Sequence, residues 1–237
     1  MEPRLELVMK RLPVISKSGR TLFAAVAVLS LALGACDRNE LERGRINLSL
    51  GDYPMAIRFF QASVEKNPQL YDGRLGLGQA LLQKAFAEND SAAFGYALVQ
   101  LEACRSLSPS QDLSEILTDA YYERARSQLK NQDTVAALSS LSKAIDRGPT
   151  NPKPFNLVGI VYGKLGESEK AEALFRKALL LDSMDASANF NLGMIDWQAG
   201  ETRLAHGHWL KALTALPHDE DVLYWFALSE KKLRENP

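Results

Sequence analysis

The sequence predicts an all-α protein made of about five helix pairs and a closing helix, preceded by an export signal. Apolar residues follow a helical spacing across the body of the chain, and no alternating apolar run indicates a sheet. Small and aromatic residues recur in that body with a period of about 34 residues, which indicates a repeat protein. The first 36 residues have the basic, apolar and small-residue segments of a secretory signal.

Composition supports a folded body and argues against several classes of partner. The chain has 237 residues, of which 46% are hydrophobic, so it can bury a substantial core. Its formal net charge is −1, whereas nucleic-acid-binding proteins usually carry a basic excess. Two cysteines are too few for a disulfide framework. We therefore expect no nucleic-acid partner.

The N-terminal segment predicts a lipid anchor. Residues 4–20 are basic and polar, and residues 21–33 form an uncharged apolar run of about 13 residues, shorter than the roughly 20 needed to span a membrane. The segment Leu33-Gly34-Ala35-Cys36 that follows resembles the lipobox of bacterial lipoproteins. This resemblance implies a signal peptide over residues 1–35 and a lipid on Cys36, with the mature protein attached to a membrane in the bacterial cell envelope and facing the periplasm.

Two features of this segment stay open. Translation starts at Met1 or at Met9, since Met9 followed by Lys10-Arg11 gives a more ordinary signal length. Asp37 resembles the residue that retains some lipoproteins in the inner membrane, but that rule transfers poorly between bacterial groups. Inner and outer membrane therefore both remain possible.

The clearest repeats are residues 152–185 and 186–219. Four pairs of small residues recur 34 positions apart: Gly159 and Gly193, Gly166 and Gly200, Ala171 and Ala205, Ala178 and Ala212. Glycine and alanine allow two helix backbones to approach closely, and glycine favours the left-handed conformation that ends a helix. Together with Phe155, Tyr162 and Phe175, these spacings resemble those of the tetratricopeptide-repeat (TPR) family.

The resemblance implies a right-handed α-solenoid over residues 36–237. Its repeats are expected at about 37–70, 71–111, 112–151, 152–185 and 186–219, with a capping helix over 220–235. The second repeat has about seven extra residues, which longer helices can accommodate because seven residues make almost two turns. The third repeat, in which Tyr122 opens the pattern, has six residues more than the period of 34. We place most of these six residues in a turn over Gln128–Asp133.

The same resemblance implies a binding surface. In this family the first helix of each pair lines an inner surface that holds a peptide or a helix of a partner protein. The residues expected on it are Asn156, Ile160, Phe190, Met194, Trp197, Tyr224 and Leu228. Aromatic and methionine side chains suit the anchoring of apolar groups, although several of them could simply pack between helices. Only Lys153 and Asn191 fit the two-carboxylate clamp of chaperone-binding relatives, which disfavours that role.

The chain offers little to an enzyme. His206 and His208 are two apart, so on a helix they point about 200° from each other, and His218 follows a proline. Cys104 occupies a small-residue position of the repeat, where a buried structural thiol is expected. Asp119 and Glu123 are best explained as solvated carboxylates. With no phosphate loop, nucleophile elbow or metal cluster, we expect no catalysis, cofactor, metal or small-molecule substrate.

Two functions therefore remain from the sequence. The first is a lipid-anchored scaffold that binds proteins in the cell envelope and helps to assemble an envelope machine. The alternative is a lipoprotein that binds a small ligand or a cell-wall glycan, which requires a closed polar pocket that repeats alone do not supply.

Overall fold

The computed structural model describes residues 39–88 and 90–235, and in these ranges every regular element is a helix. The eleven described helices are an unlabelled helix over residues 39–49 and helices α3 to α12. The predicted signal peptide, the lipidation site Cys36 and Asp37 lie outside the described residues. None of the described helices is long and apolar enough to cross a membrane.

The chain forms two compact units, and the first extends to Ala80. Its described part holds the helix over 39–49, α3 (Tyr53–Lys66) and the beginning of α4 (Tyr71–Glu88). Phe60 of α3 is 1% exposed and lies against Gly44 and Gly76, where an added Cβ atom would overlap its ring. Glycine on both neighbouring helices therefore creates the space for this aromatic side chain.

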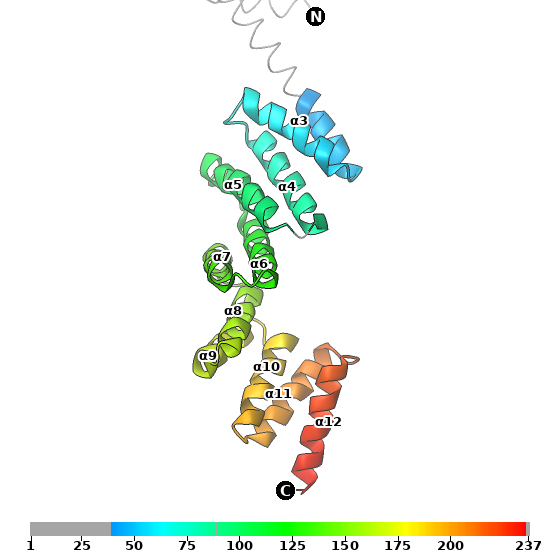
Figure 1. The fold of residues 1–237 in the computed structure, drawn as a ribbon, viewed down its shortest axis with the longest axis vertical. Helices are drawn as coiled ribbons and strands as arrows, with labels where there is room; N and C mark the ends of the chain where they lie inside the picture. Colours follow the sequence, from blue (N-terminus) through cyan, green and yellow to red (C-terminus); the bar gives the residue numbers. More distant parts are fainter. Residues whose placement is uncertain (1–38, 89, 236–237) are drawn as a thin grey trace, which may run out of the picture. The chain divides into compact units, whose positions relative to one another are not determined.

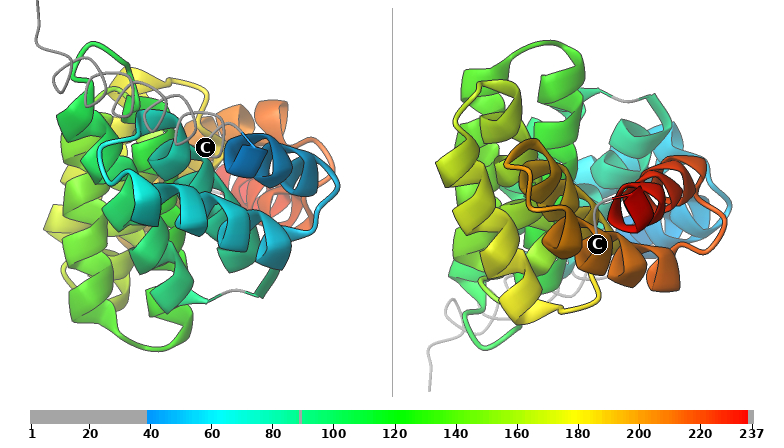
Figure 2. Two further views of the ribbon diagram at one scale, coloured as in Figure 1. Left: turned by 90° about the horizontal axis from the view of Figure 1, so that it is seen from above. Right: turned by 90° about the horizontal axis from the view of Figure 1, so that it is seen from below.

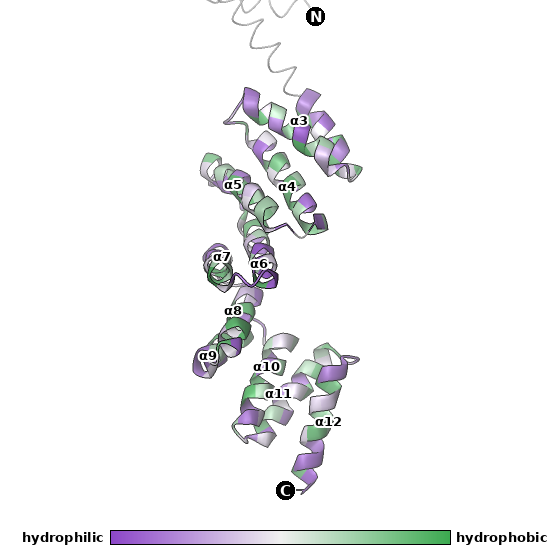
Figure 3. Ribbon diagram, viewed as in Figure 1, coloured by the Kyte–Doolittle hydropathy of each residue, from purple (hydrophilic) through white to green (hydrophobic). Residues whose placement is uncertain are grey.

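The second unit begins at Leu81, within α4, and contains the remaining helices (Figure 1). They are α5 (Ser91–Leu107), α6 (Ser114–Lys130), α7 (Thr134–Arg147), α8 (Pro152–Lys164), α9 (Ser168–Leu181), α10 (Ala186–Gln198), α11 (Thr202–Ala215) and α12 (Glu220–Glu235). Helices α6 and α7, α8 and α9, and α10 and α11 pack as pairs, and each pair contacts the next (Figure 2). Hydrophobic and hydrophilic residues occur together on each helix (Figure 3), as expected where one face packs and another meets water.

Two of the pairs share a contact between glycine and an aromatic ring. A Cβ atom on Gly159 would lie 2.6 Å from the ring of Phe175, and one on Gly193 would lie 2.5 Å from that of Trp209. Phe175 is 3% exposed and Trp209 is fully buried. The recurrence of glycine at 34 residues thus reflects the same close approach of a first helix to its second helix.

The second repeat is longer because its helices are longer, as the sequence predicted. Helix α4 has 18 residues and α5 has 17, whereas α8 and α9 have 13 and 14.

The placement of the extra residues of the third repeat was wrong. Helix α6 continues to Lys130, so the turn before α7 is no longer than the one between α8 and α9. The amide of Asp133 donates to the carbonyl of Gln128 at 2.9 Å, as Glu167 does to Tyr162 at 3.0 Å. Gln128, and not Tyr122, is therefore the equivalent of Tyr162, and the extra residues extend the beginning of α6.

The residue that ends each first helix explains why this register was hard to predict. Gly166 and Gly200 have φ angles of 78° and 83°, and Gln132 occupies the same place with a φ of 61°. Glycine adopts this left-handed conformation without strain, but glutamine does so rarely, and the sequence therefore lacks its usual marker at this turn.

Candidate protein-binding surface

The residues predicted for the binding surface lie on three first-type helices, α8, α10 and α12, but they are not equally accessible. Asn156 on α8 is only 7% exposed, and its Nδ2 donates to Asp185 Oδ1 at 3.3 Å. Ile160 is half-buried and packs against the core of the α8/α9 pair. Helix α8 therefore offers little open apolar surface at these two positions.

Helix α10 carries the predicted stripe of Phe190, Met194 and Trp197, and all three side chains are half-buried. Their spacing of four and three residues places them on one face of the helix. The backbone carbonyl of Phe190 accepts a hydrogen bond from Trp209 Nε1 at 3.2 Å, which ties this part of α10 to α11.

Aromatic rings connect α10 with α11 and α12. The ring of Trp197 lies 5.8 Å from that of Trp209 and 6.0 Å from that of Trp225, between centroids. Lys232 Nζ lies 4.2 Å from the centroid of the Trp197 ring, a distance suited to a cation–π contact. Trp197 thus packs between helices as well as lining the stripe, so its truncation is expected to lower stability.

Tyr224 is the most accessible aromatic residue of the predicted set. It is 63% exposed, and its ring contacts Trp225 edge-on with a centroid distance of 5.5 Å. Leu228, four residues later on α12, is half-buried. Through Trp225 the structure therefore joins Trp197 on α10 to Tyr224 on α12.

Sequence reasoning missed Trp225 and Lys232. The family's pattern places surface residues of α12 at 224 and 228, whereas Trp225 belongs to the face that packs on α11. The sequence offered one signal for this contact, namely Trp209 and Trp225 in addition to Trp197. Large aromatic side chains on neighbouring helices tend to pack together.

His206, His208 and Cys104 occupy structural positions, whereas His218 is exposed. His206 Nδ1 lies 3.0 Å from Ser229 Oγ, and its ring stacks on Phe226 with a centroid distance of 4.7 Å. His208 also lies between helices, and Cys104 is fully buried. The part of the chain that the structure describes holds no group of three or more potential metal ligands.

His208 belongs to a buried polar cluster with Asn189 and Asp196. His208 Nδ1 lies 3.1 Å from Asn189 Oδ1, and its Nε2 lies 3.6 Å from Asp196 Oδ2, which is buried without a hydrogen bond. Burial raises the pKa of Asp196, against the attraction of His208 and Arg176. Burial likewise lowers the pKa of His208, against the attraction of Asp196. The cluster is a costly polar site inside a helix pair.

A polar pocket bears on the alternative function. A hollow of about 500 Å³ lies where the ends of α5 and α7 meet the beginning of α6, with Arg105, Arg147, Asp112 and Asp146 among its lining residues. The pocket is open to solvent, and its lining has two basic and two acidic side chains. These properties differ from the closed polar pocket that a small ligand or glycan requires.

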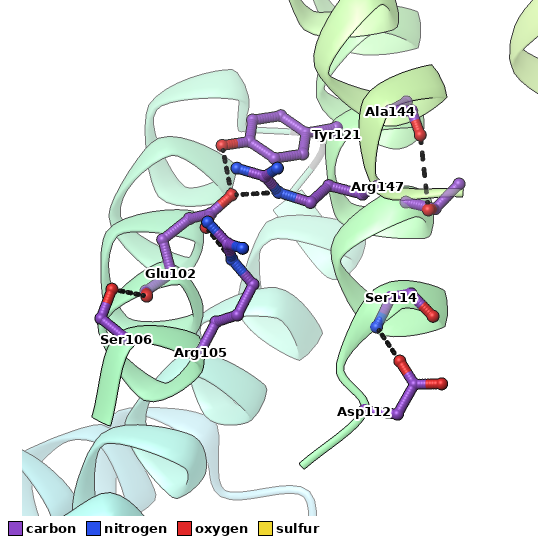
Figure 4. Close-up of polar contacts among 9 residues, drawn as sticks. Glu102, Arg105, Ser106, Asp112, Ser114, Tyr121, Ala144 and Arg147 are labelled. Atoms are coloured by element: carbon purple, nitrogen blue, oxygen red, sulfur yellow. Dashed lines mark hydrogen bonds and ion pairs between the residues drawn. The ribbon is translucent and has the colours of Figure 1, made fainter. Parts of the chain in front are cut away.

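The two arginines of this pocket are held by one carboxylate, Glu102 (Figure 4). Arg147 Nε donates to it at 2.9 Å, Arg105 Nε at 3.0 Å and the hydroxyl of Tyr121 at 3.1 Å. Partial burial alone raises the pKa of Glu102, but these hydrogen bonds and the charge of Arg147 outweigh it and hold the pKa below its usual value. Glu102 thus joins α5, α6 and α7, which is a structural role.

Comparison with known families supports the repeat assignment. A family model described as tetratricopeptide repeat matches residues 159–220, which contain both glycine–aromatic contacts of α8 to α11. Residues 159–220 are thus recognised as tetratricopeptide repeat, and they cover α9, α10 and α11 and the end of α8. Comparison with curated protein sequences finds no match.

Several solved structures share the fold of this chain. A crystal structure of MamA has a TM-score of 0.54 and 20% sequence identity, covering 76% of this chain and 92% of MamA. A tetratricopeptide repeat protein from Parabacteroides merdae has a TM-score of 0.56 and 18% identity, covering 85% and 75% of the two chains. YrrB, described as a TPR protein with an unusual peptide-binding site, has a TM-score of 0.52 and 16% identity, covering 78% and 89%. At these identities the similarity concerns the fold.

Proposed function

We propose that this TPR protein is a lipid-anchored scaffold of the bacterial cell envelope that holds a peptide or helix of a partner protein, and that it serves the assembly of an envelope machine. The observation that carries the proposal is the aromatic surface formed by α10 and α12. Tyr224 is exposed there, and Phe190, Met194 and Trp197 lie half-buried on the neighbouring first helix. Rigid aromatic side chains and an adaptable methionine side chain can anchor the apolar residues of a bound segment.

Two further observations support a protein partner. YrrB, which shares the fold, is described as having a peptide-binding site. The pocket beside Arg105 and Arg147 is open and carries balanced charge, which makes the small-ligand or glycan alternative the weaker one.

The lipid anchor rests on the segment before the described residues. The apolar run 21–33 followed by Leu33-Gly34-Ala35-Cys36 supports lipidation of Cys36. We expect mass spectrometry of the membrane fraction to find a diacylated peptide that begins at Cys36, and Cys36→Ser to release or mislocalise the protein. A signal segment that remains intact on the purified native protein contradicts this part of the proposal.

The binding surface is tested by separating binding from stability. Tyr224→Ala removes an exposed ring, so partner capture is expected to weaken by about 1–2 kcal/mol or more while the thermal melt stays nearly unchanged. Leu180→Ala is the matched control, because Leu180 is 86% exposed but lies on the second-type helix α9. Equal capture of the partner by the parent and by Tyr224→Ala, or equal losses in both variants, contradicts the assignment.

A further inference from the structure

Helix α12 packs in the same register as the first helix of a pair. Val222 and Ser229 are its buried residues, at 3% and 0% exposure, and they pack against α11. They lie 34 residues after Ala188 and Ile195, with which α10 packs against α9. Ser229 Oγ also lies 3.0 Å from His206 Nδ1 of α11. Helix α12 therefore packs on α11 as a first helix packs on the preceding pair.

The face that receives a second helix is open on α12. In α10 this face consists of Asn189, Gly193 and Asp196, all of them buried under α11. The residues 34 positions later are Leu223, Ala227 and Glu230. Leu223 is 41% exposed, Ala227 is exposed and Glu230 is half-buried, and no described helix covers them. A hollow of about 390 Å³ on this part of α12 is lined by Ala227 and by the charged residues Glu230, Lys231, Arg234 and Glu235.

We propose that this face, the Leu223–Ala227–Glu230 face, is a docking site for an amphipathic helix of a partner protein, which packs on α12 as α9 packs on α8 and α11 on α10. The site continues the helix-pair interface that the chain already forms between α8 and α9 and between α10 and α11. It borders the surface around Tyr224, which lies three residues before Ala227, but it receives a second-type helix, so it goes beyond the surface proposed above for peptide binding.

The size of residue 227 specifies the apolar residue that the partner helix must carry. Glycine at the equivalent place receives an aromatic ring, since Gly159 lies under Phe175 and Gly193 under Trp209. A Cβ atom at either glycine would overlap the ring, so Ala227 excludes a ring at that distance. The α6/α7 pair shows the alternative: Ala125 lies in the same buried cluster as Leu141, with Ala137 four residues before that leucine. The partner helix is therefore expected to present a leucine to Ala227.

Glu230, whose Oε2 lies 3.6 Å from Arg234 Nη2 on the same helix, adds a polar requirement. At its equivalent position in the α6/α7 pair, Gln128 Oε1 accepts a hydrogen bond from Ser140 at 2.8 Å. In the α10/α11 pair, Asp196 faces His208 with 3.6 Å between Oδ2 and Nε2. In both pairs the polar partner directly precedes the residue that packs on the small position. The partner helix therefore carries a hydrogen-bond donor or a cation just before its leucine, and alanines four residues before and three residues after that leucine.

The chain itself supplies a probe with this pattern. Helix α7 contains Ala137, Ser140, Leu141 and Ala144 in the required spacing. A helix-stabilised, fluorescently labelled peptide with the sequence of residues 134–147 is titrated with the full-length protein in detergent, and anisotropy is measured; stabilisation is needed because a free peptide of this length forms little helix. We expect saturable binding that Ala227→Phe weakens by about tenfold or more, because the added ring fills the place of the leucine. The same peptide with Leu141→Ala is also expected to bind the parent protein about tenfold or more weakly, because it lacks the leucine that packs on Ala227.

A reversal of specificity gives a result that misfolding cannot produce. Ala227→Gly opens the face to an aromatic ring, so this variant is expected to bind a stabilised peptide of residues 202–215, which carries His208 and Trp209, more tightly than the parent does. Leu180→Ala, at an exposed residue of α9, is expected to bind the 134–147 peptide as tightly as the parent does. Undiminished binding of the 134–147 peptide to Ala227→Phe, or the absence of a gain in Ala227→Gly, overturns the proposal.

Discussion

At the scale of single residues, the fifth repeat differs from the fourth by three coordinated exchanges. Phe155, Leu174 and Tyr162 pack in the core of the α8/α9 pair. The residues 34 positions later are Asn189, His208 and Asp196, which form the buried polar cluster. The exchanges keep the helix pair but replace apolar contacts with polar ones, which cost stability unless every group is satisfied.

The free-energy cost of burying Asp196 in this polar cluster can be measured. Its pKa is raised above 3.8 by burial, so the folded state binds this proton more tightly than the unfolded state. The corresponding stability is present below about pH 3.8 and is lost as the pH rises through the folded pKa. Asp196→Asn is therefore expected to raise the free energy of unfolding at pH 7 by about 1 kcal/mol, and this gain is expected to shrink as the pH falls toward 3.8.

Urea unfolding at several pH values tests this expectation. Asp119→Asn is the control, since Asp119 is exposed on α6 and its exchange is expected to change stability little at any pH. A gain for Asp196→Asn that grows on acidification would show that the sign assigned to Asp196 is wrong.

At the scale of helix pairs, stability depends on the close approach of a glycine to an aromatic ring. Gly159→Ala places a Cβ atom 2.6 Å from the ring of Phe175, which is itself buried in the pair. We expect a loss of about 1–3 kcal/mol in the free energy of unfolding. At Gly163 on the same helix an added Cβ atom would meet no atom closer than 3.9 Å. Gly163→Ala is therefore expected to raise the free energy of unfolding by up to about 1 kcal/mol. If denaturant unfolding shows equal effects for the two variants, the proposed contact does not limit the packing.

The second helices give an independent test of the same register. Ala171 and Ala205 are 1% and 0% exposed, so Ala171→Leu and Ala205→Leu are each expected to cost about 1–3 kcal/mol by overpacking. Ala173→Leu is the control, because Ala173 is exposed on the same helix as Ala171. Thermal melts of the three variants should separate the two buried positions from the exposed one, and unchanged melting of both buried variants contradicts the register.

The register could be predicted where the sequence keeps its glycines and failed where it does not. Gly159, Gly166 and their counterparts 34 residues later mark a close approach and a left-handed turn, and both follow from the absence of a side chain. In the third repeat, Ala125 and Gln132 occupy these two places, so the apparent match of Tyr122 was misleading. The backbone hydrogen bond from Asp133 to Gln128 and the positive φ of Gln132 reveal the true alignment.

The candidate surface was predicted less completely than the fold. Spacing alone placed Phe190, Met194 and Trp197 on one helical face. It could not show that Asn156 is buried, nor that Trp197 packs on Trp225, because both depend on contacts with other helices.

At the scale of the whole molecule, the helices of the second unit stack pair upon pair and end in α12, a first helix without a described partner. Stacked helix pairs of this kind present extended surfaces that suit the binding of other proteins. We propose that the surface of α10 and α12 around Tyr224 binds a partner protein in the cell envelope.

Photo-crosslinking in intact cells tests that claim most directly. A photoreactive amino acid is placed at Tyr224 or Met194 and, as a control, at Leu180 on α9. We predict that positions 224 and 194 crosslink to the same protein of the envelope, and that position 180 does not. Crosslinks of equal yield and identity from position 180, or no crosslinked protein from positions 194 and 224, would contradict the account.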